Sequence, residues 1–174
     1  YLIVHGYNKV LDLNKKRKIK NLLKISKYLP LGISIYSPSE LYKSKKLVKS
    51  EYIQAPVNIF DQRFISKNVI NFLKRNNICF CARSIYLQGL LLQNKKFIKN
   101  KHPKYYRDFE NFFDHSSKNY EERKKILAHF VFQNKNIDKV VVGFDNCKQL
   151  KDLIKVLDNN FNLNNKQISS FKKN

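Results

Sequence analysis

The sequence has no stretch of about 18 consecutive apolar residues, the length that a membrane-spanning helix needs. It has only three cysteines, Cys79, Cys81 and Cys147, which are too few for a disulfide scaffold and suit a reducing compartment. It begins at Tyr1 rather than at Met, without the basic, apolar and small-residue segments of a signal peptide. We therefore expect a cytoplasmic protein without a membrane span, and we expect the chain to be a fragment of a longer one.

Acidic residues are scarce, since 13 Asp and Glu stand against 35 Lys and Arg and leave a net charge of +22. Only six of the basic residues are Arg, and the Lys residues are spread along the chain. Proteins that read nucleic acids depend on Arg, whose planar fork makes bidentate contacts. We therefore expect no specific nucleic-acid partner, only weak, salt-dependent contact with polyanions. A basic α/β protein that binds nucleic acid stays open as an alternative.

The length of 174 residues and the 43% hydrophobic content suit one globular domain. Five short apolar runs stand out, and near-continuous runs of this length are typical of strands buried on both faces. They cover residues 1–5, 31–36, 52–55, 78–82 and 139–143.

Between these runs, apolar residues recur at the spacing of an α-helix. Apolar stripes predict helices over about 15–29, 65–75, 106–113, 120–131 and 146–157. Asn76 and Asn77 are expected to end the second of these, and a further helix is expected to begin at Ser39, with Ser39 as its cap. The last helix carries Leu150, Leu153, Ile154 and Leu157, with Asp145 or Asn146 as its cap. Alternating strands and helices indicate an α/β fold with a parallel sheet. Residues 159–174 form a polar tail in which Ile168 and Phe171 could dock a short helix.

Polar residues or glycine lie at the end of each of the five runs or shortly after it. In parallel α/β folds ligands bind at the carboxyl ends of the strands, so these residues are candidates for a ligand site. They are His5, Ser34, Gln54 with Asn58, Arg83 with Ser84, and Gly143 with Asp145 and Asn146.

Several well-known site patterns are absent. There is no Walker-type phosphate loop, no G-x-S-x-G elbow and no H-E-x-x-H motif. Cys79 and Cys81 lie two residues apart on a predicted strand, without a second Cys/His pair at metal-binding spacing. We therefore expect no metal site.

Four segments, in order along the chain, carry a resemblance to a known family. They are Gly32–Pro38, Ile53–Arg63, Ala82–Leu91, and Val140–Asp145 followed by Gln149 and Leu150. Together they resemble the aldo/keto reductases. The resemblance implies a partial (β/α)₈ TIM barrel of about five parallel β/α units, with residues 1–158 as strands four to eight of the barrel. It also implies an NAD(P)H-dependent oxidoreductase that reduces the carbonyl of a small molecule to an alcohol.

The resemblance implies a role for each candidate residue. His5 matches the histidine that donates a hydrogen bond to the substrate carbonyl, and Ser34 and Gln54 match residues that hold the nicotinamide carboxamide. Arg83, followed by Ser84, stands where many members place an aromatic ring on the nicotinamide. The phosphate-binding segment corresponds to Gly143, Asp145, Asn146 and Gln149.

The sequence departs from the family pattern at three places. Asp145 puts a negative charge where members that prefer the 2′-phosphate carry a neutral or basic residue, so NAD is an alternative to NADP. Ile35 replaces an Asn that commonly follows the matched Ser. The family's catalytic Asp, Tyr and Lys come from strands one to three, which this chain does not contain. We therefore expect the chain alone to be inactive, and a catalytically inactive barrel fragment that acts as a binding module stays open.

Overall fold

The computed structural model describes residues 2–5, 21, 24–25, 27–47, 50–115, 120–158, 161 and 163. The chain divides into two compact units. Unit 1 comprises Tyr1–Val57, Asp61–Arg83 and Lys135–Val141, and unit 2 comprises Asn58–Phe60, Ser84–Asn134 and Val142–Asn174.

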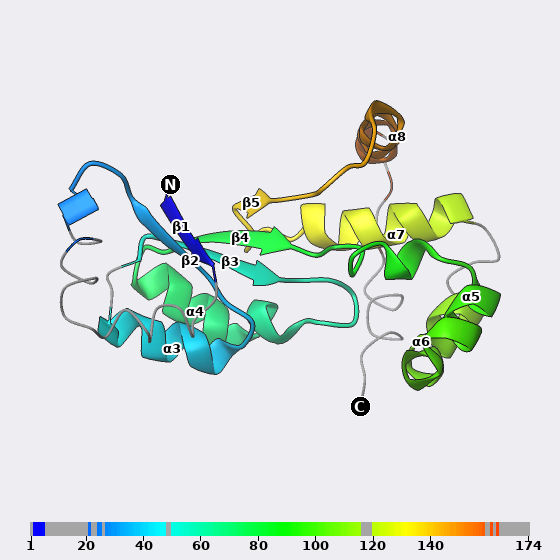
Figure 1. Cartoon of the computed structure of the whole chain (residues 1–174), viewed down its shortest axis with the longest axis horizontal. Helices are drawn as coiled ribbons and strands as arrows, with labels where there is room; N and C mark the ends of the chain where they lie inside the picture. The colour runs from blue at the N-terminus through cyan, green and yellow to red at the C-terminus, as the bar shows by residue number, and fades with distance from the viewer. Residues whose placement is uncertain are drawn as a thin grey trace. The chain divides into compact units, whose positions relative to one another are not determined.

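Unit 1 is built on a five-stranded sheet in which every strand pairs in parallel with the next strand along the chain, in the order β1-β2-β3-β4-β5 (Figure 1). This arrangement confirms the predicted five parallel strands of an α/β fold. The strands are β1 (Leu2–His5), β2 (Leu31–Ser34), β3 (Tyr52–Pro56), β4 (Cys79–Arg83) and β5 (Lys139–Val140).

β5 is shorter than the predicted run of 139–143. Val141 still donates its backbone N–H to the carbonyl of Ala82 at 2.8 Å, but no regular strand follows. β5 pairs only with β4 and forms one end of the described sheet.

The apolar face of the sheet carries Val4, Ile33, Ile53 and Phe80, which are neighbours in the register. Ile33, Ile53 and Phe80 are at most 1% exposed. Helices α3 (Pro38–Leu47) and α4 (Lys67–Arg75) lie on one side of the sheet (Figure 1). The short helix η1 (Arg63–Ile65) precedes α4, and its Phe64 ring lies 6.4 Å from that of Phe80.

The first turn of α3 differs from the prediction in its cap. Ser39 was expected to cap this helix, but Pro38 is already helical, and the hydroxyl of Ser37 accepts the N–H of Glu40 at 3.4 Å. Proline suits the first helical position because its missing N–H would have no partner there. The cap is therefore Ser37. The carboxylate of Glu40 in turn accepts the backbone N–H of Tyr36 at 2.7 Å, which fixes the chain between β2 and α3.

The first helices of unit 2 occupy a connection in which only one short helix was predicted. That helix is α6 (Pro103–His115), which is longer than the predicted 106–113, and it packs beside α5 (Lys95–Lys101), which was not predicted. The side chain of Asn94 caps α5 by accepting the N–H of Phe97 at 2.7 Å. The short helix η2 (Leu90–Leu92) precedes α5.

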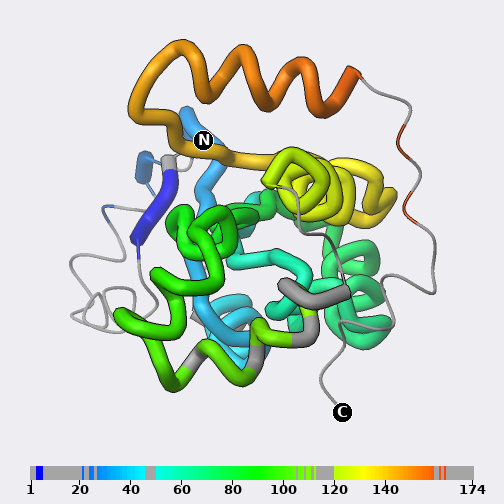
Figure 2. The backbone as a smooth tube through the Cα atoms, turned by 90° about the vertical axis from the view of Figure 1, so that its right-hand side faces the viewer, coloured from blue at the N-terminus to red at the C-terminus, as the bar shows by residue number. Residues whose placement is uncertain are grey.

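Helices α7 (Tyr120–Phe132) and α8 (Cys147–Asp158) of unit 2 pack against each other (Figure 2). Leu153 and Val156 of α8 are buried against Ala128 of α7. The expected apolar stripe of α8 was wrong in part, because Leu150 and Ile154 are 42% and 49% exposed. These two residues lie outside the face that Leu153 and Val156 present to α7.

Some predicted elements lie outside the described residues. They are most of the helix expected over about 15–29, and Ile168 and Phe171 in the tail. Among the residues that the structure describes, no helix is long and apolar enough to cross a membrane.

Candidate functional site

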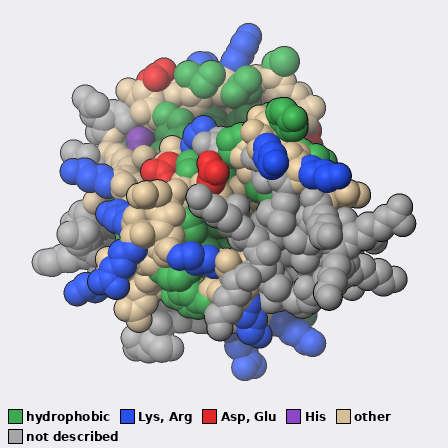
Figure 3. Space-filling model, turned by 90° about the vertical axis from the view of Figure 1, so that its left-hand side faces the viewer, with side chains coloured by type: hydrophobic (Ala, Val, Ile, Leu, Met, Phe, Trp, Pro, Cys, Tyr) green, Lys and Arg blue, Asp and Glu red, His purple; other side chains and the backbone are tan. Residues whose placement is uncertain are grey.

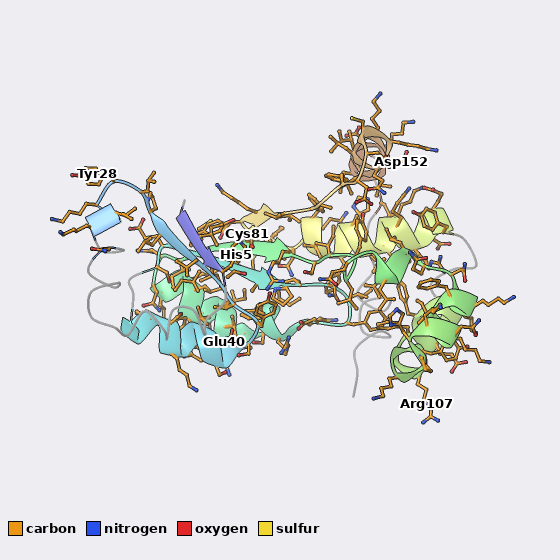
Figure 4. The ribbon with its side chains drawn as sticks, in the orientation of Figure 1. His5, Tyr28, Glu40, Cys81, Arg107 and Asp152 are labelled. Atoms are coloured by element: carbon orange, nitrogen blue, oxygen red, sulfur yellow. The ribbon has the colours of Figure 1, made fainter. Side chains whose placement is uncertain are left out.

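The register of unit 1 aligns three of the predicted site residues across neighbouring strands. His5 is paired with Ser34, Ser34 with Gln54, Gln54 with Cys81, and Cys81 with Lys139. Side chains at paired positions of neighbouring strands lie on the same face of a sheet, so these five residues form one row, which we call the polar row. It lies on the face opposite Ile33 and Ile53, and Figure 4 labels two of its members, His5 on β1 and Cys81 on β4.

The polar row changes in exposure along its length. His5 is exposed, whereas Ser34 and Gln54 are 1% and 8% exposed. Burial of a hydroxyl and an amide costs free energy unless both form hydrogen bonds. A serine hydroxyl beside a glutamine amide offers donors and acceptors at fixed positions, which is the chemistry needed to orient a planar carboxamide.

Cys81 is the next member of the polar row after Gln54, and its side chain is fully buried. Burial raises the pKa of the Cys81 thiol, and this effect exceeds the opposing effects of hydrogen bonds from Tyr52 and Gln54 and of the charge of Lys139. Cys81 is therefore a neutral thiol at physiological pH, in contact with a predicted cofactor-binding side chain.

Arg83 at the end of β4 contacts the segment that follows β2. Its guanidinium carbon lies 4.4 Å from the centroid of the Tyr36 ring, and its Nη2 donates to the carbonyl of Ile35 at 3.3 Å. The Ile35 side chain is completely buried, and its backbone N–H donates to the carbonyl of Gln54 at 2.9 Å. The backbone of Ile35, rather than its side chain, thus links β2, β3 and Arg83.

The remaining predicted site residues belong to unit 2. Ser84 has a left-handed backbone, with φ of 59°, and its carbonyl accepts a hydrogen bond from the Asn58 side chain at 3.3 Å. Non-glycine residues rarely adopt this conformation, and where they do the local contacts hold them in it. Asn58 is 1% exposed, and its Oδ1 accepts the N–H of Phe60 at 3.0 Å.

The amino-terminal end of α8 holds Asn146, Gln149 and Asp145 in a hydrogen-bonded cap. Of the two predicted caps, the structure uses Asn146, whose Oδ1 accepts the N–H of Gln149 at 3.1 Å. The side chain of Gln149 accepts the N–H of Asp145 at 2.9 Å and donates to its carboxylate at 3.3 Å. A Cβ on Gly143 would meet no atom within 4 Å, so the backbone there is open to close approach. A capped helix start that follows an open glycine has the features of an anion-binding segment.

Two residues of unit 1 that contact predicted site residues were not predicted as part of the site. Tyr36 lies beyond the last residue of β2, Ser34, so strand alternation does not place it, and only the fold brings it to Arg83. Cys81 could have been found from the period of two, because it precedes Arg83 by two residues on the same strand.

Basic side chains occur at separate points around the surface viewed in Figure 3, rather than in one cluster. This distribution agrees with the spread of Lys along the sequence.

The comparison that identifies the family covers most of the chain. The model of the aldo/keto reductase family matches residues 24–174. The chain belongs to the aldo/keto reductase family. No curated protein sequence matches this aldo/keto reductase chain.

Solved structures of aldo/keto reductases share the fold at low sequence identity. The holo form of the aldo-keto reductase AKR11C1 from Bacillus halodurans has a TM-score of 0.69 and 14% identity, over 97% of this chain and 58% of that one. The glycerol dehydrogenase AKR11B4 from Gluconobacter oxydans has a TM-score of 0.55 and 19% identity, over 89% of this chain and 51% of that one. The present chain therefore spans between half and three fifths of the length of these enzymes.

Proposed function

We propose that the protein is an NAD(P)H-dependent oxidoreductase that reduces the carbonyl of a small molecule to an alcohol. Residues 1–158 would supply the C-terminal part of its barrel. The observation that carries the proposal is the polar row, in which His5, Ser34 and Gln54 occupy neighbouring register positions on one face of a parallel sheet. Membership of the aldo/keto reductase family supports the reaction class.

The side chains of the candidate site have the chemical groups that a nicotinamide dinucleotide needs. Ser34 and Gln54 provide the hydroxyl and amide that a carboxamide needs, and Arg83 provides a planar cation able to stack on an aromatic ring. Gly143, Asn146 and the first turn of α8 provide an open backbone and a positive helix end for a phosphate. When bound, the reduced dinucleotide supplies a hydride.

The role proposed for His5 is to orient the substrate. A neutral imidazole donates an N–H to the carbonyl oxygen, and this hydrogen bond strengthens as negative charge grows on that oxygen. Ser84, Asp145 and Gln149 are proposed to support cofactor binding through the backbone at the end of β4 and the start of α8. Asp145 disfavours a 2′-phosphate by charge, so both NADP and NAD are retained as cofactors.

The decisive experiment is a binding titration. The purified chain is titrated with NADPH and separately with NADH, and the fluorescence of the reduced nicotinamide is followed. We expect Ser34→Ala and Gln54→Ala each to weaken binding, by about tenfold for one lost hydrogen bond to the ligand. Ser44→Ala is the matched control, because Ser44 is also buried but its hydroxyl bonds to the carbonyl of Leu41 within α3.

Two results would contradict the proposal. One is the absence of binding of either dinucleotide to the wild-type chain, and the other is equal loss of binding in the Ser44 control and the Ser34 variant. Asp145→Asn should shift the preference toward NADPH by removing the negative charge, which tests the cofactor assignment separately.

Turnover by this chain alone is not expected. A barrel of this type closes with eight strands, and the described sheet has five. Loss of reduced-cofactor absorbance above background, on addition of NADPH and a reactive aldehyde, would overturn this expectation.

A further inference from the structure

The contact between Tyr36 and Arg83 joins two strands that are not neighbours. Tyr36 follows β2 and Arg83 ends β4, and β3 lies between these strands in the sheet. Their contact, with the guanidinium carbon 4.4 Å from the ring centroid, therefore passes over the carboxyl end of β3. Gln54 lies on β3, two residues before its last residue Pro56.

Arg83 lies two residues beyond Cys81 within β4, so the alternation of the strand puts its side chain on the face of the polar row. Tyr36 lies beyond the last residue of β2, and its contact with the Arg83 guanidinium brings its ring to the same end of the sheet. The pair thus spans the end of the face that carries the buried Ser34 and Gln54.

The backbone of Tyr36 is fixed by the start of α3. Its backbone N–H donates to the Glu40 carboxylate, and Ser37 and Pro38 begin α3 directly after it. The side chain nevertheless remains 57% exposed. An exposed ring on a fixed backbone, with a guanidinium over it, is suited to position that planar group rather than to fill a core.

We propose that Tyr36 is a positioning residue for nicotinamide binding, which acts by holding the guanidinium of Arg83 over its ring, beside the carboxyl end of β3. The inference rests on the proposed function and extends it to a residue that the family resemblance does not assign. An arginine side chain has many rotamers, and fixing one of them costs conformational entropy at the moment of binding. The stacked ring and the bond to the Ile35 carbonyl fix the side chain before the ligand arrives, which reduces that cost.

The test compares ligands with and without a nicotinamide ring. The wild-type chain, Tyr36→Ala and Tyr36→Phe are titrated with NADPH, with NADH, and with adenosine 2′,5′-bisphosphate, which lacks the nicotinamide. We expect Tyr36→Ala to weaken dinucleotide binding about three- to tenfold, as for the loss of one cation–π contact, and Tyr36→Phe to bind as the wild type does. Binding of adenosine 2′,5′-bisphosphate should be the same in all three proteins.

A double variant tests whether Tyr36 acts through Arg83. Because the proposed effect passes through the guanidinium, Tyr36→Ala combined with Arg83→Leu should bind no more weakly than Arg83→Leu alone. Tyr28→Ala is the matched control, since this tyrosine is also in unit 1 and is 86% exposed, and it should change nothing. Circular dichroism and thermal unfolding establish that each variant is folded.

The outcomes separate this inference from the proposed function. If the wild type binds neither dinucleotide, the proposed function fails and the inference fails with it. If the wild type binds but Tyr36→Ala binds equally well, only the inference is overturned. Tighter binding by Tyr36→Ala would mean that the ring competes with the ligand for Arg83, and equal weakening for all three ligands would mean a merely structural role. Either result overturns the inference.

Discussion

Replacing Gly32 by Ala should lower the free energy of unfolding by about 1–3 kcal/mol, as is typical of overpacking in a core. A Cβ at this position would lie 2.8 Å from Cδ1 of Tyr52, 3.2 Å from the Tyr52 carbonyl oxygen and 3.3 Å from Cγ1 of Ile3. Carbon atoms in favourable contact are about 3.5–4.0 Å apart, so the Tyr52 ring would have to move by roughly 0.7 Å or more. Tyr52 is only 5% exposed, and its displacement would disturb its hydrogen bond to Cys81.

The assay is urea denaturation followed by circular dichroism. With a dependence of about 2 kcal/mol per molar urea, the predicted loss lowers the midpoint by about 0.5–1.5 M. Gly143→Ala is the matched control, because a Cβ there meets no atom within 4 Å. That substitution should leave stability unchanged or raise it by up to about 1 kcal/mol, since alanine restricts the unfolded chain. A midpoint for Gly32→Ala equal to or above that of Gly143→Ala would refute the reasoning.

Three further predictions concern other parts of the structure. Asn146→Ala removes the cap that accepts the N–H of Gln149, and it should lower the free energy of unfolding by about 0.5–2 kcal/mol, measured by urea denaturation. An unchanged urea midpoint would contradict this prediction. His129→Phe should cost about 1–3 kcal/mol in the same assay, because the buried carbonyl of Val156 loses the ring nitrogen 2.9 Å away. Burial raises the pKa of Cys81 above its ordinary 9.0. As the pH rises past 9, the unfolded chain therefore loses this proton while the folded chain still keeps it. The stability that this thiol contributes is present below about pH 9 and is lost as the pH rises further. Between pH 8 and pH 10 the wild type should therefore lose more stability than Cys81→Ala, and equal losses in the two proteins would contradict the stated cause.

The strands and their parallel order could be predicted from the sequence because each strand is marked by its own short apolar run. The five apolar runs are separated by helical spacing, and this order alone requires parallel strands. The alignment of Ser34 with Gln54 follows from each being a polar residue near the end of such a run. Asn76 and Asn77, predicted to stop a helix, do so in α4, where Asn77 adopts a left-handed φ of 50°.

Other features depend on contacts that a local pattern does not contain. The pairing of Tyr36 with Arg83 joins residues on two non-neighbouring strands and requires the sheet order to be known. The exposure of Leu150 in α8 depends on which face of that helix meets α7. The cap of α3 is a different case, because Ser37 and Ser39 have the same capping chemistry and a local preference, that of Pro38 for the first helical position, distinguishes them.

The loop after β4 has an implication for engineering the protein. Leu87, Gln88 and Gly89 are consecutive left-handed residues, with φ of 49°, 55° and 81°. Each side chain forced into this conformation costs about 1–2 kcal/mol, and only Gly89 escapes that cost. Gln88 is exposed, so its side chain contributes little packing that a substitution would lose. Position 88 is therefore a place where introducing glycine, which ordinarily weakens a fold, should make it more resistant to heat.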